Sequence, residues 1–376
     1  PPENYAALLF SRLYRMTLPE EDMRETAACF AGTPYPAALW EEVIFPARVK
    51  NYRESCLDKL LAAGEYSWRM EENGKICFES PEQTDWEAEP EIPWEALSEK
   101  ERILTETLAK RGACFMQSLN GLLGGESPYE TLVSLMEKGL ISADSFVPVR
   151  QWLGRKKTEK AAPRQRVGAR VKTLHAGRYD LVRPLLNRSL QEKMDRCFDR
   201  YLILCRETAG QCGLSWQEAL SVLRVQEYTG QVRRGYFVES LSGAQFIRKK
   251  DFESVTAALL HPKKELVWVN AAEPLQPYGK FIAHKKESAF LNVPGTAAAF
   301  YAGRLTALFE RQGKTLRVFE EENLKETLCR FAEDFRQGRI FPGKKRIAVL
   351  DYPREAESAL AESGFLREVQ KFVLYR

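Results

Sequence analysis

One local pattern recurs along the first two thirds of the chain and constrains its fold more than any other feature. A Ser followed three residues later by Glu opens a helix, because each side chain can bond to the other residue's backbone N–H. Such capping boxes stand at 98–101, 127–130 and 215–218, and apolar residues at helical spacing follow each of them. Gly139 and Gly230 end two of these helices, at positions where a left-handed cap is expected.

Short β-prone runs follow the helices, and helices followed by a hairpin predict a winged helix. In the middle segment we expect the hairpin at 140–141 and 146–147, and in the last one strands at 231–238 and 244–246. The first segment has a helix over 53–63 and then Asn-Gly between alternating strands, a hairpin signal because both turn positions need positive φ. The chain thus predicts three winged helices in series.

Beyond residue 248 the sequence changes to short strands. Turns at 302–303 and 312–313 predict a three-stranded meander. The predicted fold is α+β: tandem winged-helix domains followed by a small β-barrel-like domain with two helices. The β-prone runs are 266–270, 280–284, 296–301, 304–309, 315–319, 347–351 and 372–375, and the helices 324–336 and 354–363. The expected domains are a winged-helix-like unit (1–90), a winged helix (91–153), a basic linker (154–186), a winged helix (187–247) and the β-barrel-like domain (248–376).

Charge is distributed unevenly although the net charge is only +4. Residues 154–183 hold ten Lys and Arg against two acids, and residues 79–101 hold nine acids against one Lys. A local basic surface attracts phosphates even on a nearly neutral protein, although a solvated linker has the same composition. The candidate phosphate contacts in the basic stretch are Arg164, Arg166, Arg170, Lys172 and Arg178.

The eight cysteines form no Cys-x-x-Cys pair, and no histidine stands near them at ligand spacing. We therefore expect no metal site and read the cysteines as thiols in a reducing compartment. No apolar run is long enough to span a bilayer, and residues 1–4 lack the layout of a signal peptide. A cytoplasmic protein without a membrane partner is the expectation.

The predicted wing of the last winged helix carries a cluster suited to nucleic acid. Arg233 and Arg234 can fork onto phosphates, Gly235 permits close backbone approach, and Tyr236 can stack on a splayed base. The alternative is a strand with solvated arginines and one buried aromatic residue. No Gly-x-x-x-x-Gly-Lys-Ser/Thr loop occurs, so we expect no ATP site and no other cofactor in this chain.

Motifs in this region resemble those of one known family. Residues 230–239 read Gly-Gln-Val-Arg-Arg-Gly-Tyr-Phe-Val-Glu, and residues 243–246 read Gly-Ala-Gln-Phe. Both resemble the signature of the large helicase-related (Lhr) family of bacterial DNA helicases. Further matches follow in family order at 45–49 with Tyr52, Leu60 with 63–65, 177–179 and 277–279.

This resemblance implies the C-terminal region of an Lhr-type protein, with winged helices and a β-barrel as in AlkZ-like DNA glycosylases. It implies an ATP- and magnesium-dependent helicase core, fused upstream or on another chain, and DNA or an RNA–DNA hybrid as partner. Uracil-DNA glycosylase activity is ascribed to this region of the family. The chain departs from the AlkZ-like pattern because it has neither the Gln-hydrophobic-Gln nor the Gln-hydrophobic-Asp motif. It departs from the Lhr motif Thr-Asp-Pro-x-Asn-Pro-Tyr-Gly at 272–279, where Glu273 replaces the Asp.

Two functions therefore stand side by side, a DNA-binding module and a DNA glycosylase, with a scaffold for protein partners as a third. A glycosylase needs a carboxylate that activates water or stabilises positive charge at the sugar of a flipped base. Glu273 and Asp351 are the candidates, since both fall at strand ends or loops of the β-rich domain. Gln245 is a candidate nucleic-acid contact, and with Trp268 and Tyr278 it is a candidate to hold a base.

Overall fold

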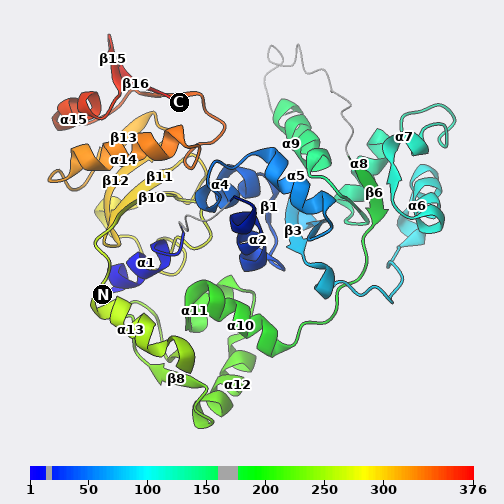
Figure 1. The fold of residues 1–376 in the computed structure, drawn as a ribbon, viewed down its shortest axis with the longest axis horizontal. Coiled ribbons are helices and arrows are strands. Elements are labelled where there is room, and N and C mark those ends of the chain that lie inside the picture. Colours follow the sequence, from blue (N-terminus) through cyan, green and yellow to red (C-terminus); the bar gives the residue numbers. More distant parts are fainter. Residues whose placement is uncertain (14–18, 160–176) are drawn as a thin grey trace. The chain divides into compact units, whose positions relative to one another are not determined.

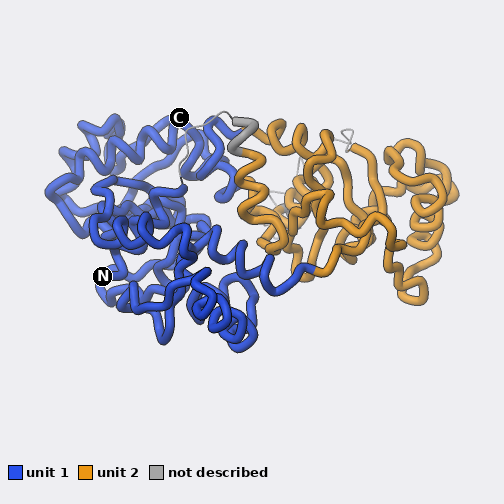
Figure 2. Tube along the Cα trace, turned by 60° about the horizontal axis from the view of Figure 1, so that its bottom comes forward, with its two compact units in different colours: residues 1–22, 42–52, 188–376 blue, residues 23–41, 53–187 orange. Residues whose placement is uncertain are grey.

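The computed structural model describes residues 1–13, 19–159 and 177–376 and combines helices with antiparallel sheets, which confirms the α+β class (Figure 1). The chain divides into two compact units (Figure 2). Unit 1 comprises residues 1–22, 42–52 and 188–376, and unit 2 comprises residues 23–41 and 53–187. Within the described ranges, no helix is long and apolar enough to cross a membrane.

The first winged helix (residues 19–79) has the expected hairpin. Asn73 and Gly74 have φ of 63° and 71°, as the Asn-Gly pair predicts. Trp40 and Phe78 meet edge to face in its core, with ring centroids 4.6 Å apart. Its elements are α2 (Pro19–Phe30), β1 (Tyr35–Pro36), α3 (Ala37–Leu39), η1 (Trp40–Ile44), α4 (Phe45–Arg48), α5 (Glu54–Ala62), β2 (Ser67–Glu71), η2 (Glu72–Gly74) and β3 (Lys75–Glu79), with sheet order β1-β3-β2.

The second winged helix (residues 99–181) differs from its prediction in the wing. The strand partner of β5 is not at 146–147, where α9 begins, but at β6, which lies in the segment predicted as linker. The prediction failed because Phe146, directly before α9, and Val149, inside it, are buried, and their apolar spacing also fits a short strand. The elements are α6 (Glu99–Arg111), β4 (Cys114–Phe115), α7 (Met116–Leu119), α8 (Tyr129–Glu137), β5 (Ile141–Ala143), α9 (Val147–Glu159) and β6 (Arg178–Leu181), with sheet order β4-β6-β5.

Between these two winged helices, short 3-10 turns η3 (Pro81–Gln83) and η4 (Trp94–Ala96) interrupt the acidic stretch. Residues 83–85 pair with residues 184–186: Asp85 N donates to Pro184 O at 2.9 Å, and Leu186 N donates to Gln83 O at 2.9 Å. Residues 83–85 of the acidic stretch are therefore held against the segment that follows β6.

The third winged helix (residues 190–248) lies in unit 1 and follows its prediction closely. Gly230 ends the helix α12 with φ of 74°, and the wing strands β8 and β9 come next. Its elements are α10 (Leu190–Tyr201), β7 (Ile203–Leu204), α11 (Arg206–Gln211), α12 (Trp216–Tyr228), β8 (Val232–Gly235) and β9 (Gln245–Arg248), with sheet order β7-β9-β8; η6 (Lys249–Asp251) and α13 (Phe252–Leu260) follow.

The β-rich domain contains the predicted meander and both predicted helices. Trp268 is fully buried against α14 and donates from Nε1 to Thr327 O at 2.7 Å. Residues 280–284, predicted as a strand, form a turn, and Leu366–Glu368 is a strand that was not predicted. The elements are β10 (Leu266–Asn270), η7 (Lys286–Ser288), β11 (Ala297–Tyr301), β12 (Arg304–Glu310), β13 (Thr315–Val318), α14 (Leu324–Arg336), β14 (Arg346–Val349), η8 (Arg354–Ala356), α15 (Glu357–Glu362), β15 (Leu366–Glu368) and β16 (Lys371–Tyr375).

These strands form two antiparallel sheets, β10-β11-β12-β13 and β14-β16-β15, which an isolated bridge between Thr315 and Asp351 connects. The N-terminal helix α1 (Pro2–Phe10) belongs to the same unit, although the sequence placed it with the first winged helix. Phe10 lies 4.5 Å from Phe300 of β11 between ring centroids, and Tyr5 Oη donates to Tyr201 O at 2.7 Å.

The capping boxes have three outcomes. At 98–101 both reciprocal hydrogen bonds form, and at 215–218 the Ser215 hydroxyl accepts from Glu218 N. At 127–130 the prediction is wrong, because Pro128 occupies the N-cap position and the Ser127 hydroxyl accepts from Tyr129 N instead. The helix α8 therefore begins at Tyr129, one residue later than the motif implies.

Candidate nucleic-acid interface

The wing of the third winged helix presents the predicted arginines to solvent. Arg233 and Arg234 on β8 are both exposed, and Tyr236 at the end of the strand is 77% exposed. The guanidinium of Arg233 lies 5.0 Å from the ring centroid of Phe252, which limits its motion. Among the described residues, the Arg234 side chain has no hydrogen-bond or ion-pair partner. The strand therefore holds one braced and one unpaired cation beside an exposed aromatic ring.

Gly235 is required by packing within the wing. A Cβ at this position would lie 2.6 Å from the ring of Phe237, closer than side-chain carbons approach one another. Phe237 in turn packs edge to face on Phe252, with ring centroids 6.0 Å apart. The glycine thus lets an aromatic ring fold over the strand, and its predicted role in backbone approach to a ligand stays a prediction.

Gln245 was predicted to contact nucleic acid, and the structure corrects this. The side chain is 1% exposed and makes four hydrogen bonds to the connection between β8 and β9. Its Oε1 accepts from the N–H groups of Phe237 and Val238, both at 2.8 Å, and its Nε2 donates to the carbonyls of Val238 and Leu241 at 2.8 and 3.2 Å. The Gln245 amide therefore provides hydrogen bonds to buried backbone groups that have no partner in a neighbouring strand. Its role is to fix the conformation of the wing.

Further basic residues stand close to the wing arginines along the chain, and they were not among the predicted contacts. Residues 224–251 hold six Lys and Arg against three acids. Arg248 is committed to structure, because it pairs with Asp199 at 2.7 Å and with Asp251 at 2.6 Å. Lys249 and Lys250 follow it in exposed positions. Two adjacent lysines directly after the second wing strand are the sequence feature that could have predicted this basic cluster.

The helix α12 occupies the position of the recognition helix in a winged helix. Ala219, Leu223 and Gln226 face the core, which leaves the opposite face to solvent. Arg224 is exposed there, and Tyr228 in the last turn is 93% exposed. An exposed tyrosine and arginine one turn apart suit contact with a base and a phosphate.

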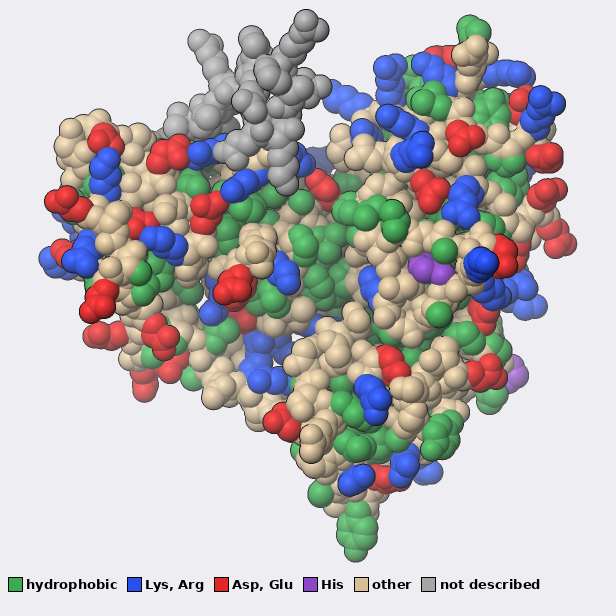
Figure 3. Space-filling model, turned by 180° about the vertical axis from the view of Figure 1, so that it is seen from behind, with side chains coloured by type: hydrophobic (Ala, Val, Ile, Leu, Met, Phe, Trp, Pro, Cys, Tyr) green, Lys and Arg blue, Asp and Glu red, His purple; other side chains and the backbone are tan. Residues whose placement is uncertain are grey.

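Of the remaining predicted phosphate contacts, Arg178 lies within the described residues. Arg178 lies on β6 in unit 2, half exposed, and is bonded through Nε to Asp144 Oδ2 at 2.7 Å. Arg164, Arg166, Arg170 and Lys172 lie outside the described residues. On the face drawn in Figure 3, Lys and Arg side chains lie among Asp and Glu side chains over most of the surface. Local clusters therefore matter more than the overall charge.

Glu273, a predicted catalytic carboxylate, is fully buried in an ion pair. Its two carboxylate oxygens accept from Arg48 Nη1 and Nη2 at 2.8 and 2.6 Å, and the side chains are 0% and 8% exposed. Lys280 Nζ donates to the Glu273 carbonyl, and burial lowers the pKa of this ammonium to about 8. A carboxylate that is fully buried and bound by a bidentate arginine is closed to solvent water, so the structure contradicts an activating role for Glu273.

Asp351 lies two residues after the end of β14, and its side chain is exposed. Its backbone bonds to Leu316 and Lys314 hold the strand end, which leaves the carboxylate available. The predicted base-holding aromatics are structural: Trp268 is in the core, and the Tyr278 hydroxyl donates to Gly303 O at 2.6 Å while its ring stacks on Phe300 at 5.3 Å. The structure does not gather the catalytic candidates into one site.

Fold and interface together define a protein of tandem winged helices joined to a β-rich domain. Comparison with protein families agrees with this class. Residues 16–80 match the family described as "Large helicase-related protein, winged-helix domain", in its third-domain form, and residues 185–266 match the fourth-domain form of the same description. The two matches contain the first and the third winged helix.

Two curated relatives carry the comparison along most of the chain. The chain is 28% identical over 384 residues to "Lhr helicase/ probable uracil glycosylase" of Mycolicibacterium smegmatis, covering 89% of this chain and 25% of that protein. It is 28% identical over 342 residues to "Lhr helicase/uracil glycosylase" of Escherichia coli, covering 78% of this chain and 22% of that protein. The resemblance to the large helicase-related family is therefore confirmed, and the chain spans about a quarter of the length of these relatives.

Proposed function

We propose that this chain is a DNA-binding module, the C-terminal part of an Lhr-type helicase that acts in DNA repair. The observation that carries the proposal is the exposed pair Arg233 and Arg234 beside Tyr236 on a wing whose shape Gln245 and Phe237 fix. Cations held on a rigid ribbon contact phosphates without losing much side-chain freedom, and the neighbouring ring can stack on a base. An RNA–DNA hybrid offers the same phosphate pattern.

The helicase core belongs to the part of the relatives' length that this chain does not span. In this proposal ATP and magnesium act there, whether the core is fused upstream or carried on another chain. The module grips the strand that the motor displaces or leaves behind. Its contribution is affinity and orientation, which the phosphate contacts of a wing supply without reading sequence.

The test is binding of a fluorescently labelled duplex at about 50 mM salt, where phosphate contacts are strongest. The double variant Arg233→Ala/Arg234→Ala should weaken binding by at least tenfold, because it removes two charge-assisted contacts. The matched control is Lys345→Ala/Arg346→Ala, which removes an exposed adjacent cation pair at the start of β14 and should leave affinity unchanged. Absence of binding by the unaltered chain, or equal affinity of the wing variant, would contradict the proposal.

A second candidate is a DNA glycosylase that hydrolyses the N-glycosidic bond of a flipped uracil. The printed names of both relatives include uracil glycosylase, and Asp351 supplies one exposed carboxylate at a strand end. Release of uracil from an oligonucleotide, followed by cleavage at the abasic site, measures this activity. Asp351→Asn should abolish it while leaving DNA affinity intact. If highly pure protein releases no uracil, the glycosylase candidate is ruled out and the DNA-binding module remains.

A further inference from the structure

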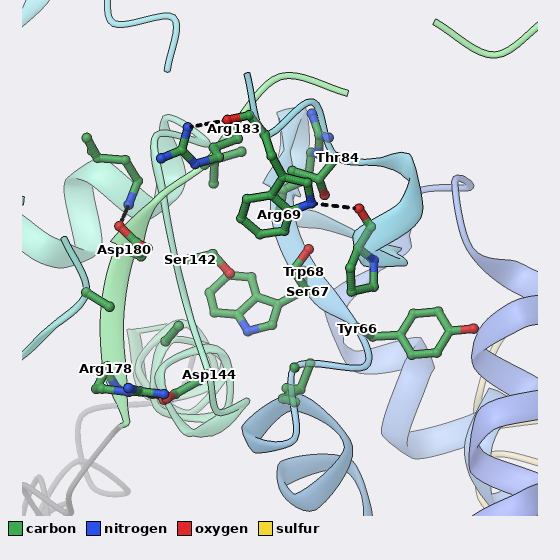
Figure 4. Close-up of a pocket in the computed structure, with 18 of the residues that line it drawn as sticks. Tyr66, Ser67, Trp68, Arg69, Thr84, Ser142, Asp144, Arg178, Asp180 and Arg183 are labelled. Atoms are coloured by element: carbon green, nitrogen blue, oxygen red, sulfur yellow. Dashed lines mark hydrogen bonds and ion pairs between the residues drawn. The ribbon is translucent and has the colours of Figure 1, made fainter. Parts of the chain in front are cut away.

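A pocket of about 310 Å³ opens in unit 2 where two edge strands meet (Figure 4). β2 is the edge strand of the first winged helix and β5 is the edge strand of the second, and the two are in contact. The paired segments 83–85 and 184–186 border the opening. This size is at the lower end of the roughly 300–1,000 Å³ that small-molecule sites have. The function proposed above uses none of the residues that line this pocket.

Aromatic surface forms one part of the pocket. Trp68 on β2 is 2% exposed and fixed by a bond from Nε1 to Ser145 O at 3.1 Å. Trp86 lies at the opening, 63% exposed, with its Nε1 bonded to Pro81 O at 3.0 Å. Arg183 lies 5.8 Å from the centroid of the Trp86 ring and also donates to the carbonyl of Ala88 at 3.1 Å. These two contacts of the indole, with Pro81 O and with the Arg183 guanidinium, keep its ring at the surface as a preformed stacking face.

Polar groups form the other part. Ser142 and Asp180 lie opposite each other in the β5–β6 register, so their side chains share one face. The Ser142 hydroxyl oxygen is buried and, among the described residues, has no hydrogen-bond partner. Buried hydroxyls without partners are rare because each one forfeits the hydrogen bonds it made to water. Figure 4 shows Ser142 between the strands at the centre of the pocket, with Asp180 on the neighbouring strand.

The charges select the kind of ligand. Asp144 neutralises Arg178 at 2.7 Å, Arg183 donates to backbone carbonyls, and Asp180 remains beside the unpartnered hydroxyl. Arg69, the third arginine of the lining, pairs with Glu71 at 3.9 Å, so each guanidinium of the pocket already has an acceptor and none is left free to hold a phosphate. A neutral planar group with donors and acceptors along its edge fits, because Ser142 can both donate and accept, Asp180 accepts and Arg69 donates.

From this arrangement we infer that the pocket binds one nucleobase turned out of a single strand, with its plane against Trp86 and its edge toward Ser142 and Asp180. The inference rests on the proposed function and deepens it, since it assigns a base contact to a module whose wing contacts phosphates. Stacking on an aromatic ring is the usual way in which proteins hold unpaired bases without reading sequence. The pocket therefore favours single-stranded over fully paired nucleic acid.

The experiment compares two labelled single strands of equal length, oligothymidine and the same backbone with abasic residues. The unaltered chain should bind the base-containing strand on the order of tenfold more tightly, the scale of stacking one base. Trp86→Ala and Ser142→Leu should each remove this preference, and Trp86→Phe should restore most of it. Trp94→Ala is the matched control, because Trp94 is 39% exposed in the same acidic stretch and does not line the pocket.

A second readout locates the base. A strand with one central 2-aminopurine should lose fluorescence on binding to the unaltered chain and to Trp94→Ala, but not to Trp86→Ala. Equal affinity for the two strands, or an unchanged preference in Trp86→Ala, overturns the pocket while the wing proposal stands. The wing variant Arg233→Ala/Arg234→Ala should bind both strands more weakly, and to the same degree. If the unaltered chain binds neither strand, the result contradicts the proposed function itself and not only the pocket.

Discussion

Replacing Glu273 by Gln tests whether this carboxylate serves structure or chemistry. Both of its oxygens bond to Arg48, one also accepts from Leu275 N at 3.2 Å, and the pair is almost fully buried. Glu273→Gln keeps the shape but leaves the Arg48 guanidinium 8% exposed without a counter-charge. Breaking one partner of a buried ion pair costs about 3–5 kcal/mol, so a loss of about 3 kcal/mol is expected where Gln retains one acceptor.

Denaturant unfolding followed by circular dichroism measures this loss for Glu273→Gln and for Arg48→Met/Glu273→Leu. The double variant removes both charges, and such replacements are often neutral, so it should recover most of the stability. DNA affinity, measured where each variant is folded, should match the unaltered chain. A Glu273→Gln chain as stable as the original, or a double variant no better than the single one, would refute the structural role.

Three further expectations concern the caps and the wing. Burial alone would raise the pKa of Glu101, but hydrogen bonds from Lys138 and the Ser98 backbone outweigh it and lower the pKa to about 2. The stabilisation by this carboxylate is thus complete above pH 4.5 and is lost as the pH falls toward 2, so the stability of Glu101→Gln should depend less on pH in that window. Gln245→Leu should speed amide exchange in the wing and weaken DNA binding, and unchanged exchange would count against its bracing role. Gly235→Ala should also speed amide exchange in the wing and weaken DNA binding, because the added methyl group displaces the Phe237 ring. It should lower the DNA affinity more than it lowers the melting temperature.

The winged-helix architecture was predictable because its signals are local. The box at 98–101, the Asn73-Gly74 turn and the end of α12 at Gly230 each act within a few residues of themselves. The wing of the second winged helix was not predictable from such signals. Its strands β5 and β6 are separated by α9 and a long segment, and no short-range rule sets a pairing across that distance.

The site residues divide in the same way. Exposure of Arg233 and Arg234 followed from their charge, because unpaired guanidinium groups stay in water. The burial of Gln245 and Glu273 did not follow from their letters, since it depends on Arg48 and on backbone groups that only the tertiary fold brings near. The pocket beside Trp86 is likewise lined by residues of the first and second winged helices together, so neither segment of the sequence predicts it alone.

The salt dependence of duplex binding tests the central claim most directly. For each phosphate contact, the slope of log affinity against log salt changes by about 0.9 on duplex DNA, so Arg233→Ala/Arg234→Ala should flatten it by about two units. Lys345→Ala/Arg346→Ala removes the same charge and should keep the original slope. If the wing variant keeps the slope of the unaltered chain, or the two double variants flatten it equally, the wing is not the surface that meets the phosphates.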